Sequence, residues 1–183
     1  YKIDKFSIYG NYDYKEEPYY QVYREGEDLP FVLFEGKRMY FPRDKRFKSI
    51  DGKEYITNLL GEQGEGSPHL YLRDRRDIKQ NGIIVDAGVC EGNFALRYVD
   101  KAKKVYLIEA DGKWIEPLEK TFRPFKDKVV LCNKFLGKYD SETSITLDSL
   151  VKENIDFLKM DVEGAETDAL LGGIDVLRRS NAE

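Results

Sequence analysis

A short segment of the chain combines two glycines with two carboxylates, Asp86-Ala87-Gly88-Val89-Cys90-Glu91-Gly92. Residues 83–85 before it are a continuous apolar run that predicts a buried strand, and residues 94–102 after it carry apolar residues at helical spacing. Gly88 permits a tight turn and the close approach of a ligand, and Gly92 lets the start of the helix pack against the strand. The segment therefore predicts a nucleotide-like ligand at a strand-to-helix turn.

The two acids favour one ligand over another. The dinucleotide fingerprint is G-x-G-x-x-G, because a diphosphate must lie on an uncluttered helix N-terminus. Here the spacing is D-x-G-x-x-x-G, with Asp86 at the strand end and Glu91 at the mouth of the helix, and two carboxylates would repel a diphosphate. S-adenosylmethionine (SAM) has no phosphate and carries a sulfonium, so an acidic mouth favours SAM over NAD. Alternatively, Asp86 only caps backbone amides in the turn.

Glu109 closes the second predicted strand, residues 105–108. An acid at this place, about 20 residues after the first strand, can accept hydrogen bonds from both ribose hydroxyls. SAM and NAD share that requirement, so Glu109 predicts an adenosine ligand without distinguishing between them. The alternative is that Glu109 is only a favourable charge near a helix N-terminus.

Asp161 follows the fourth predicted strand, residues 155–160. In doubly wound sheets the ligand binds beyond the carboxyl ends of the strands, where the strand order reverses. If the first and fourth strands are neighbours, Asp86 and Asp161 face each other across the cleft, and Asp161 can contact the methionine portion or the acceptor. Alternatively, Asp161 only caps a helix that starts near Glu163.

A hydroxyl acceptor would benefit from a base that removes its proton. Besides Asp161, the candidates are His69, Glu163 and Glu166. Histidine titrates near neutral pH, although a single histidine in a loop is more often a bystander. Glu163 and Glu166 lie in the first turn of a predicted helix, where acids are favoured regardless of chemistry. We rank Asp161 first and His69 second.

Strand and helix patterns alternate from residue 82 onward. Predicted strands occupy 83–85, 105–108, 129–131 and 155–160, and predicted helices occupy 94–102, 114–122 and 165–170, the last stopped by Gly172-Gly173. Such alternation predicts the α/β class, with right-handed βαβ units and a parallel sheet. We therefore expect a core domain over residues 68–183.

Residues 1–67 form an N-terminal extension of different composition. It is rich in tyrosine, and residues 31–34 and 38–41 predict a β-hairpin through the turn Glu35-Gly36-Lys37. Residues 43–68 are polar and interrupted by glycines, which predicts a long loop with one short helix. The extension could be a layer packed on the core, a cap on the substrate side, or an arm that forms a homo-oligomer.

Composition excludes several classes of protein. The 183-residue chain has 30 basic and 34 acidic residues and a net charge of −4, with no basic face for nucleic acid. No apolar run approaches the roughly 20 residues needed to cross a membrane. The first residues do not resemble a signal peptide, so we expect a cytoplasmic protein. One histidine and two cysteines, Cys90 and Cys132, argue against a metal centre or a disulfide framework.

Three motifs resemble a known family. Asp86 to Phe94 is similar to the first motif of class I SAM-dependent methyltransferases, and Leu107-Ile108-Glu109-Ala110 is similar to their second. Residues 155–166, preceded by Thr146-Leu147-Asp148, resemble the signature of the FkbM-type methyltransferases. Carried onto this chain, the motifs assign cofactor binding to Asp86, Gly88, Glu91, Gly92, Asn93, Glu109, Ala110 and Asp161.

The resemblance covers residues 68 to 178 and implies a Rossmann-like sheet, SAM as methyl donor, and O-methylation of a sugar, glycan or secondary metabolite. The class I fold normally has seven strands, whereas this chain ends after the fourth, so we expect a fragment, a truncated form or the ordered portion of a longer chain. The fourth strand would then be an unpaired edge, and part of the acceptor pocket would be absent. Two alternatives remain: an NAD-dependent oxidoreductase, and a non-catalytic binding module with a methyltransferase-like fold.

Overall fold

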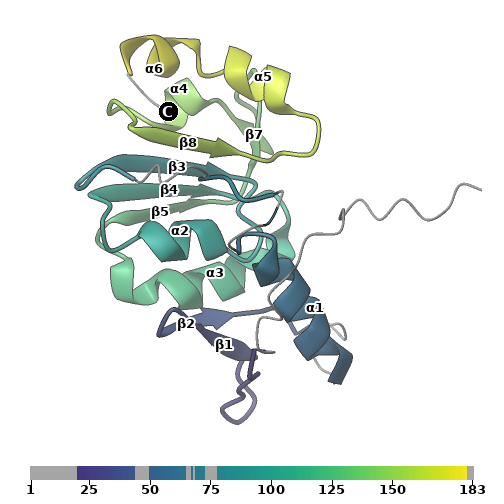
Figure 1. Ribbon diagram of the computed structural model, residues 1–183. Helices are drawn as coiled ribbons and strands as arrows, with labels where there is room; N and C mark the ends of the chain where they lie inside the picture. Colours follow the sequence, from purple (N-terminus) through teal and green to yellow (C-terminus); the bar gives the residue numbers. More distant parts are fainter. Residues whose placement is uncertain (1–19, 44–49, 65–66, 68, 73–77, 181–183) are drawn as a thin grey trace, which may run out of the picture.

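A four-stranded parallel sheet forms the centre of the computed structural model, which describes residues 20–43, 50–64, 67, 69–72 and 78–180 (Figure 1). Its strands lie in the order β5-β4-β3-β8. Their bounds are Ile83–Ala87 (β3), Lys104–Ile108 (β4), Val129–Cys132 (β5) and Phe157–Met160 (β8). The predicted Rossmann-like α/β class is confirmed, and the first and fourth predicted strands are neighbours, which is the condition for Asp86 and Asp161 to lie at the same strand ends.

The apolar runs form strands because both faces of the sheet are covered. Every residue of β3 is buried, and in the register of the sheet Val85 lies between Tyr106 of β4 and Leu158 of β8. The last strand begins two residues later than predicted. Asp156, just before it, instead accepts a hydrogen bond from the backbone N–H of Ile83 at 2.9 Å. This bond holds the amino ends of β3 and β8 together.

Helices cover the two faces of the sheet (Figure 1). On one face lie α2 (Asn93–Tyr98) and α3 (Ile115–Phe122), the latter flanked by single 3₁₀ turns at Gly112–Trp114 and Arg123–Phe125. On the other face lie α4 (Leu147–Leu150), α5 (Glu166–Leu171) and α6 (Ile174–Arg179). The core is divided accordingly, because alternate residues of each strand point to opposite faces.

The segment from β5 to the end holds elements that the sequence analysis missed. Gly172-Gly173 ends α5, as predicted, but α6 follows at once, because the carboxylate of Asp148 accepts hydrogen bonds from the backbone N–H groups of Asp175 and Val176 at 3.2 and 2.7 Å. Two short parallel strands, β6 (Phe135–Leu136) and β7 (Ser144–Ile145), were also not expected.

The N-terminal part contains the predicted hairpin, β1 (Phe31–Phe34) and β2 (Lys37–Tyr40). Its turn has two residues rather than three, because Glu35 and Gly36 both have positive φ, 49° and 78°, as a tight hairpin turn requires. The hairpin packs on α3, where Thr121 Oγ1 accepts a buried hydrogen bond from the backbone N–H of Tyr40 at 2.9 Å. The described part of the extension is thus a packed layer, and its roles as cap or oligomerisation arm stay predictions.

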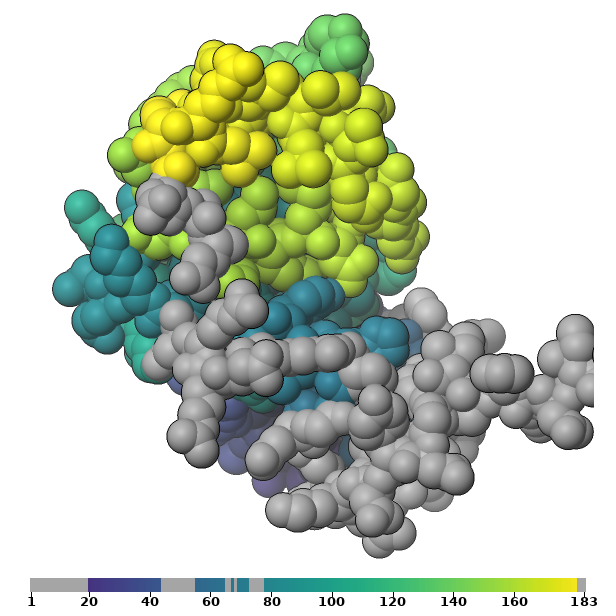
Figure 2. All heavy atoms as spheres, turned by 45° about the horizontal axis from the view of Figure 1, so that its top comes forward, coloured from purple at the N-terminus to yellow at the C-terminus, as the bar shows by residue number. Residues whose placement is uncertain are grey.

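The polar segment after the hairpin contains α1 (Ile50–Gly61), a helix of 12 residues and longer than the short one predicted. In Figure 1 it lies beside α3 and the β1–β2 hairpin. In the space-filling view, residues between α1 and β3 (blue) meet residues that follow β8 (yellow-green) at the surface (Figure 2). None of the described helices combines the length and the apolar character needed to cross a membrane.

Glu153 provides a test of the packing at the amino ends of the strands. Its carboxylate accepts hydrogen bonds from Lys104 at 2.7 Å and Tyr106 at 2.6 Å, and these lower its pKa to about 2. Because the folded pKa lies below the unfolded one, the stabilisation is complete above about pH 4.5 and is lost as the pH falls towards 2. We expect Glu153→Gln to lower the melting temperature at pH 7 but hardly at pH 2, as measured by circular dichroism. An equal loss at both pH values would contradict this assignment.

Candidate cofactor site at the turn after β3

The turn after β3 is built on a close approach between two strand ends. Gly88 has φ of 72°, and a Cβ placed on it would lie 1.7 Å from the backbone carbonyl oxygen of Asp161. That distance excludes any side chain, so residue 88 must be glycine for β3 and β8 to end side by side. The backbone N–H of Gly88 donates to Ile108 at 2.9 Å, which ties the same turn to β4.

Gly92 has a related role at the start of α2, where Asn93 is the first, buried residue. With φ of 82° at Gly92, a Cβ there would lie 2.9 Å from the Phe122 ring and 3.0 Å from the Leu118 side chain. The glycine therefore lets α2 pack against α3, rather than against the strand as the sequence analysis expected. Cys90, between the two glycines, also has positive φ, 52°.

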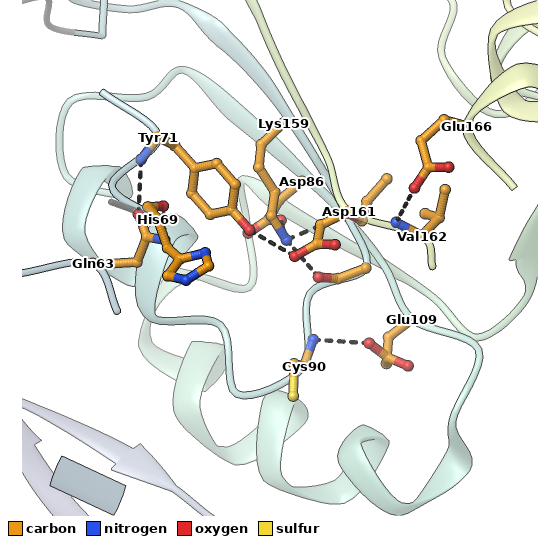
Figure 3. A network of polar contacts seen from close by, with 12 residues as sticks. Gln63, His69, Tyr71, Asp86, Cys90, Glu109, Lys159, Asp161, Val162 and Glu166 are labelled. Atoms are coloured by element: carbon orange, nitrogen blue, oxygen red, sulfur yellow. Dashed lines mark hydrogen bonds and ion pairs between the residues drawn. The ribbon is translucent and has the colours of Figure 1, made fainter. Parts of the chain in front are cut away.

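Glu109 connects the end of β4 to the turn (Figure 3). One carboxylate oxygen accepts the backbone N–H of Cys90 at 2.8 Å, and the other accepts that of Asp111 at 2.7 Å. The Asn133 side chain fixes the backbone there by donating to the carbonyls of Glu109 and Ala110 at 2.8 and 3.2 Å. A carboxylate has about four acceptor positions, so Glu109 keeps the capacity to bind further hydroxyl groups.

Asp86 lies behind the turn instead of at its mouth. Its side chain is fully buried, and Oδ1 lies 3.0 Å from Nζ of Lys159 in β8 (Figure 3). Lys159 also donates to the backbone carbonyls of Ala87 and Gly88. Burial raises the pKa of Asp86, and the positive charge of Lys159 opposes this shift. Burial alone would lower the pKa of Lys159, but the negative charge of Asp86 has the larger effect and raises it.

The expected acidic mouth is therefore wrong for Asp86, because Lys159 compensates its charge inside the protein. The alternative that Asp86 caps backbone amides applies to the start of α2 rather than to the turn, since the Ala95 backbone N–H lowers the pKa of Asp86 while Oδ1 pairs with Lys159. Contact between Asp86 and a cofactor stays a prediction.

Glu91, the second acid of the turn, is also buried. Burial is the main cause that raises its pKa to about 7, and the charge of Asp86 adds to the shift. The neighbouring Cys90 thiol has a raised pKa as well, first through burial and then through the charge of Glu91. Near neutral pH the turn thus has less negative charge than its two carboxylates suggest.

Asp161 is the exposed carboxylate of the site. Its Oδ2 accepts a hydrogen bond from the Tyr71 hydroxyl at 2.7 Å, which links the end of β8 to the segment before β3 (Figure 3). Asp161 does not cap α5, because Glu166 accepts the backbone N–H groups of Val162 and Gly164 at 3.3 and 3.2 Å. Glu166 is thereby occupied by the loop before α5, which has no side-chain cap, and Glu163 is exposed at φ of 50°.

His69 lies two residues before Tyr71, in the same segment. Gln63 holds this segment by donating to the carbonyl of His69 at 2.8 Å and accepting the backbone N–H of Tyr71 at 3.1 Å. Figure 3 draws the His69 ring beside the Tyr71 ring, on the side of the segment that faces Asp161. The two residues ranked as bases thus belong to one region, and their roles stay predictions.

The comparisons with known proteins decide the family. The sequence model described as "Methyltransferase FkbM domain" matches residues 87–182, just over half of the chain. The chain belongs to the FkbM methyltransferase family. The methyl donor of this family is SAM. No curated protein matches the chain.

One solved structure agrees with the FkbM assignment at the level of the fold. A methyltransferase FkbM from Methylobacillus flagellatus KT is similar over 60% of this chain and 33% of its own, with 21% identity and a TM-score of 0.54. A putative methyltransferase from Streptococcus mutans, in complex with SAH, is similar over 57% of this chain and 60% of its own, with 18% identity and a TM-score of 0.42. The chain thus spans about a third of the FkbM structure's length.

Lys159, Tyr71, Gln63 and Asn133 contact this candidate site and were not predicted from the sequence. Lys159 carried a signal, since a lysine inside an apolar strand run that becomes buried needs an acidic partner. Tyr71 and Gln63 lie in a polar segment without periodicity, and only the folded chain brings them to Asp161. Among the described residues, no group of three or more His, Cys, Asp or Glu side chains is placed to hold a metal ion.

The buried ion pair leads to a stability prediction. Lys159→Met leaves Asp86 buried without a cation, and loss of one partner of a buried pair costs about 3–5 kcal/mol. The double variant Asp86→Asn, Lys159→Met should recover most of that loss. Urea denaturation gives the free energy of unfolding for each variant. If Lys159→Met unfolds with the parent's free energy, the ion pair does not exist in solution.

Glu91 leads to a prediction on pH. Its pKa is raised to about 7 in the folded chain, so the folded state keeps the Glu91 proton to a higher pH than the unfolded state does. The stability of the folded chain therefore falls as the pH rises from about 4.5 through 7. Glu91→Gln removes this effect. We expect little change at pH 4.5 and a gain of up to about 3 kcal/mol at pH 8 in urea denaturation. A gain that is the same at both pH values would rule out titration of Glu91 as the cause.

Proposed function

We propose that this chain binds SAM at the turn between β3 and α2 and transfers its methyl group to a hydroxyl of a sugar, glycan or secondary metabolite. The observation that carries the proposal is the junction of Gly88 with Asp161, where the strand order reverses. The chain runs from β3 through β4 to β5 and then returns to β8 on the other side of β3. Ligands of doubly wound sheets bind at such a point.

The residues at this point fit the parts of SAM. Glu109, fixed by two backbone N–H groups, has acceptor positions left for the two ribose hydroxyls. Gly88 keeps side chains away from the turn. Asp86 lies buried beneath the turn, where its carboxylate would attract the ammonium group of the methionine portion through its charge.

SAM would supply the methyl group: its bond to the sulfonium sulfur would break as the acceptor oxygen attacks in line, and the sulfur would leave as the thioether of SAH. The protein's contribution is to align the acceptor oxygen with that methyl group, and alignment can be worth up to roughly 7–11 kcal/mol. As the acceptor oxygen bonds to the methyl carbon, its proton must go to a base. We assign this role to Asp161, the exposed carboxylate next to the turn, and keep His69 as the second candidate.

Calorimetric titration with SAM, SAH and NAD tests the proposed cofactor site. We expect SAM and SAH to bind and NAD not to bind, and we expect Glu109→Gln to weaken SAM binding about tenfold, because a charge-assisted hydrogen bond to ribose is lost. Glu119→Gln, a change of the same kind on the exposed side of α3, serves as the matched control. NAD binding without SAM binding would reject the proposal. SAM binding without methylated product from any hydroxyl acceptor would favour a non-catalytic module.

A further inference from the structure

We infer that Tyr71 is a positioning residue for Asp161 and that Gln63 holds Tyr71 in place. The segment between α1 and β3 would then form one wall of the site, although it precedes the residues that match the family. The inference rests on the proposed function for its meaning in catalysis. Its structural basis is the set of contacts around Tyr71.

Tyr71 contacts the site through both its hydroxyl and its ring. The hydroxyl donates to Asp161 Oδ2 at 2.7 Å, and a hydrogen bond to a charged group is among the stronger ones in proteins. The ring packs edge-on against Phe94 of α2, with centroids 5.8 Å apart, and Lys159 Nζ lies 5.3 Å from the ring centroid. Tyr71 thus spans α2 and β8 and covers the lysine that is paired with Asp86.

These contacts fix the direction of the Asp161 carboxylate. An exposed aspartate has rotational freedom that a base must lose before it can accept a proton from a bound hydroxyl. The Tyr71 hydroxyl engages Oδ2, and a bound acceptor hydroxyl would then meet Oδ1. The raised pKa of Tyr71, caused first by burial and then by the bond to Asp161, keeps the phenol protonated as a donor.

Gln63 fixes the backbone of Tyr71 from the opposite side. Its side chain is 6% exposed and uses both ends, with Oε1 accepting from Tyr71 N–H and Nε2 donating to the His69 carbonyl. The backbone carbonyl of Gln63 accepts from Arg97 Nη1 at 2.9 Å, and Arg97 Nε pairs with Glu35 in the hairpin turn at 2.6 Å. A continuous set of polar contacts therefore runs from the hairpin to Asp161.

Tyrosine-ζ ¹³C NMR with calorimetry tests this inference. The resonance that disappears in Tyr71→Phe is assigned to Tyr71. The resonance of Tyr23 serves as the control, because Tyr23 lies in the hairpin region and its exposed fraction, 40%, is close to the 39% of Tyr71. We expect Asp161→Ala and Gln63→Met each to shift the Tyr71 resonance and to leave that of Tyr23 in place. A Tyr71 resonance that does not respond to Asp161→Ala overturns the inference, whether or not SAM binds.

The second readout connects Tyr71 with the cofactor. SAM should shift the Tyr71 resonance, and Tyr71→Phe should weaken SAM binding by roughly threefold to tenfold with little change in melting temperature, because the ring and its packing remain. Tyr23→Phe should bind SAM like the parent. If the parent binds no SAM, the proposed function fails while the response to Asp161→Ala still decides the positioning role. If Tyr71→Phe binds SAM like the parent, Tyr71 is not part of the site.

Discussion

The contact between Gly88 and the backbone carbonyl of Asp161 is the constraint on which the site depends. It permits two strands that are distant in sequence to end side by side, and it brings the exposed carboxylate of Asp161 to the turn. Because the turn is also bonded to β4 through Gly88 and Cys90, three strand ends are fixed by one short segment. A ligand that binds there meets a preformed surface, so its binding free energy is not reduced by the entropic cost of ordering the site. This is the physical advantage of building a site on rigid strands.

Charge compensation within the core is the second principle of this site. Asp86 alone would be costly to bury, and Lys159 would be equally costly. Together they place a pair with no net charge beneath the turn, and the lysine also binds the turn's carbonyls. The preference for a cationic cofactor can therefore not come from two exposed acids. In the proposed site it would come from the orientation of individual groups, namely Glu109 and Asp161.

The strands and the turn could be predicted because their signals are local. The apolar runs, the glycines and Glu109 can each be interpreted from a few neighbouring residues, because strands and turns are determined by short stretches of sequence. The burial of Asp86 could not be predicted in this way, since it depends on Lys159, which lies across the sheet. Tyr71 was missed for the same reason. The helix α6 begins because of Asp148, which lies in a different helix, so periodicity alone could not separate it from α5.

The pairing of Glu35 with Arg97 has a consequence for exchanging parts between related chains. A hairpin grafted from a relative would keep its own fold and could still fit on α3, because its main-chain geometry is set by its turn. Without an acid at the position of Glu35, however, Arg97 would lose its ion pair, and its hold on the Gln63 carbonyl would loosen. In such a chimera, the choice of residue at the tip of the hairpin would set how firmly the distant wall of the site is held.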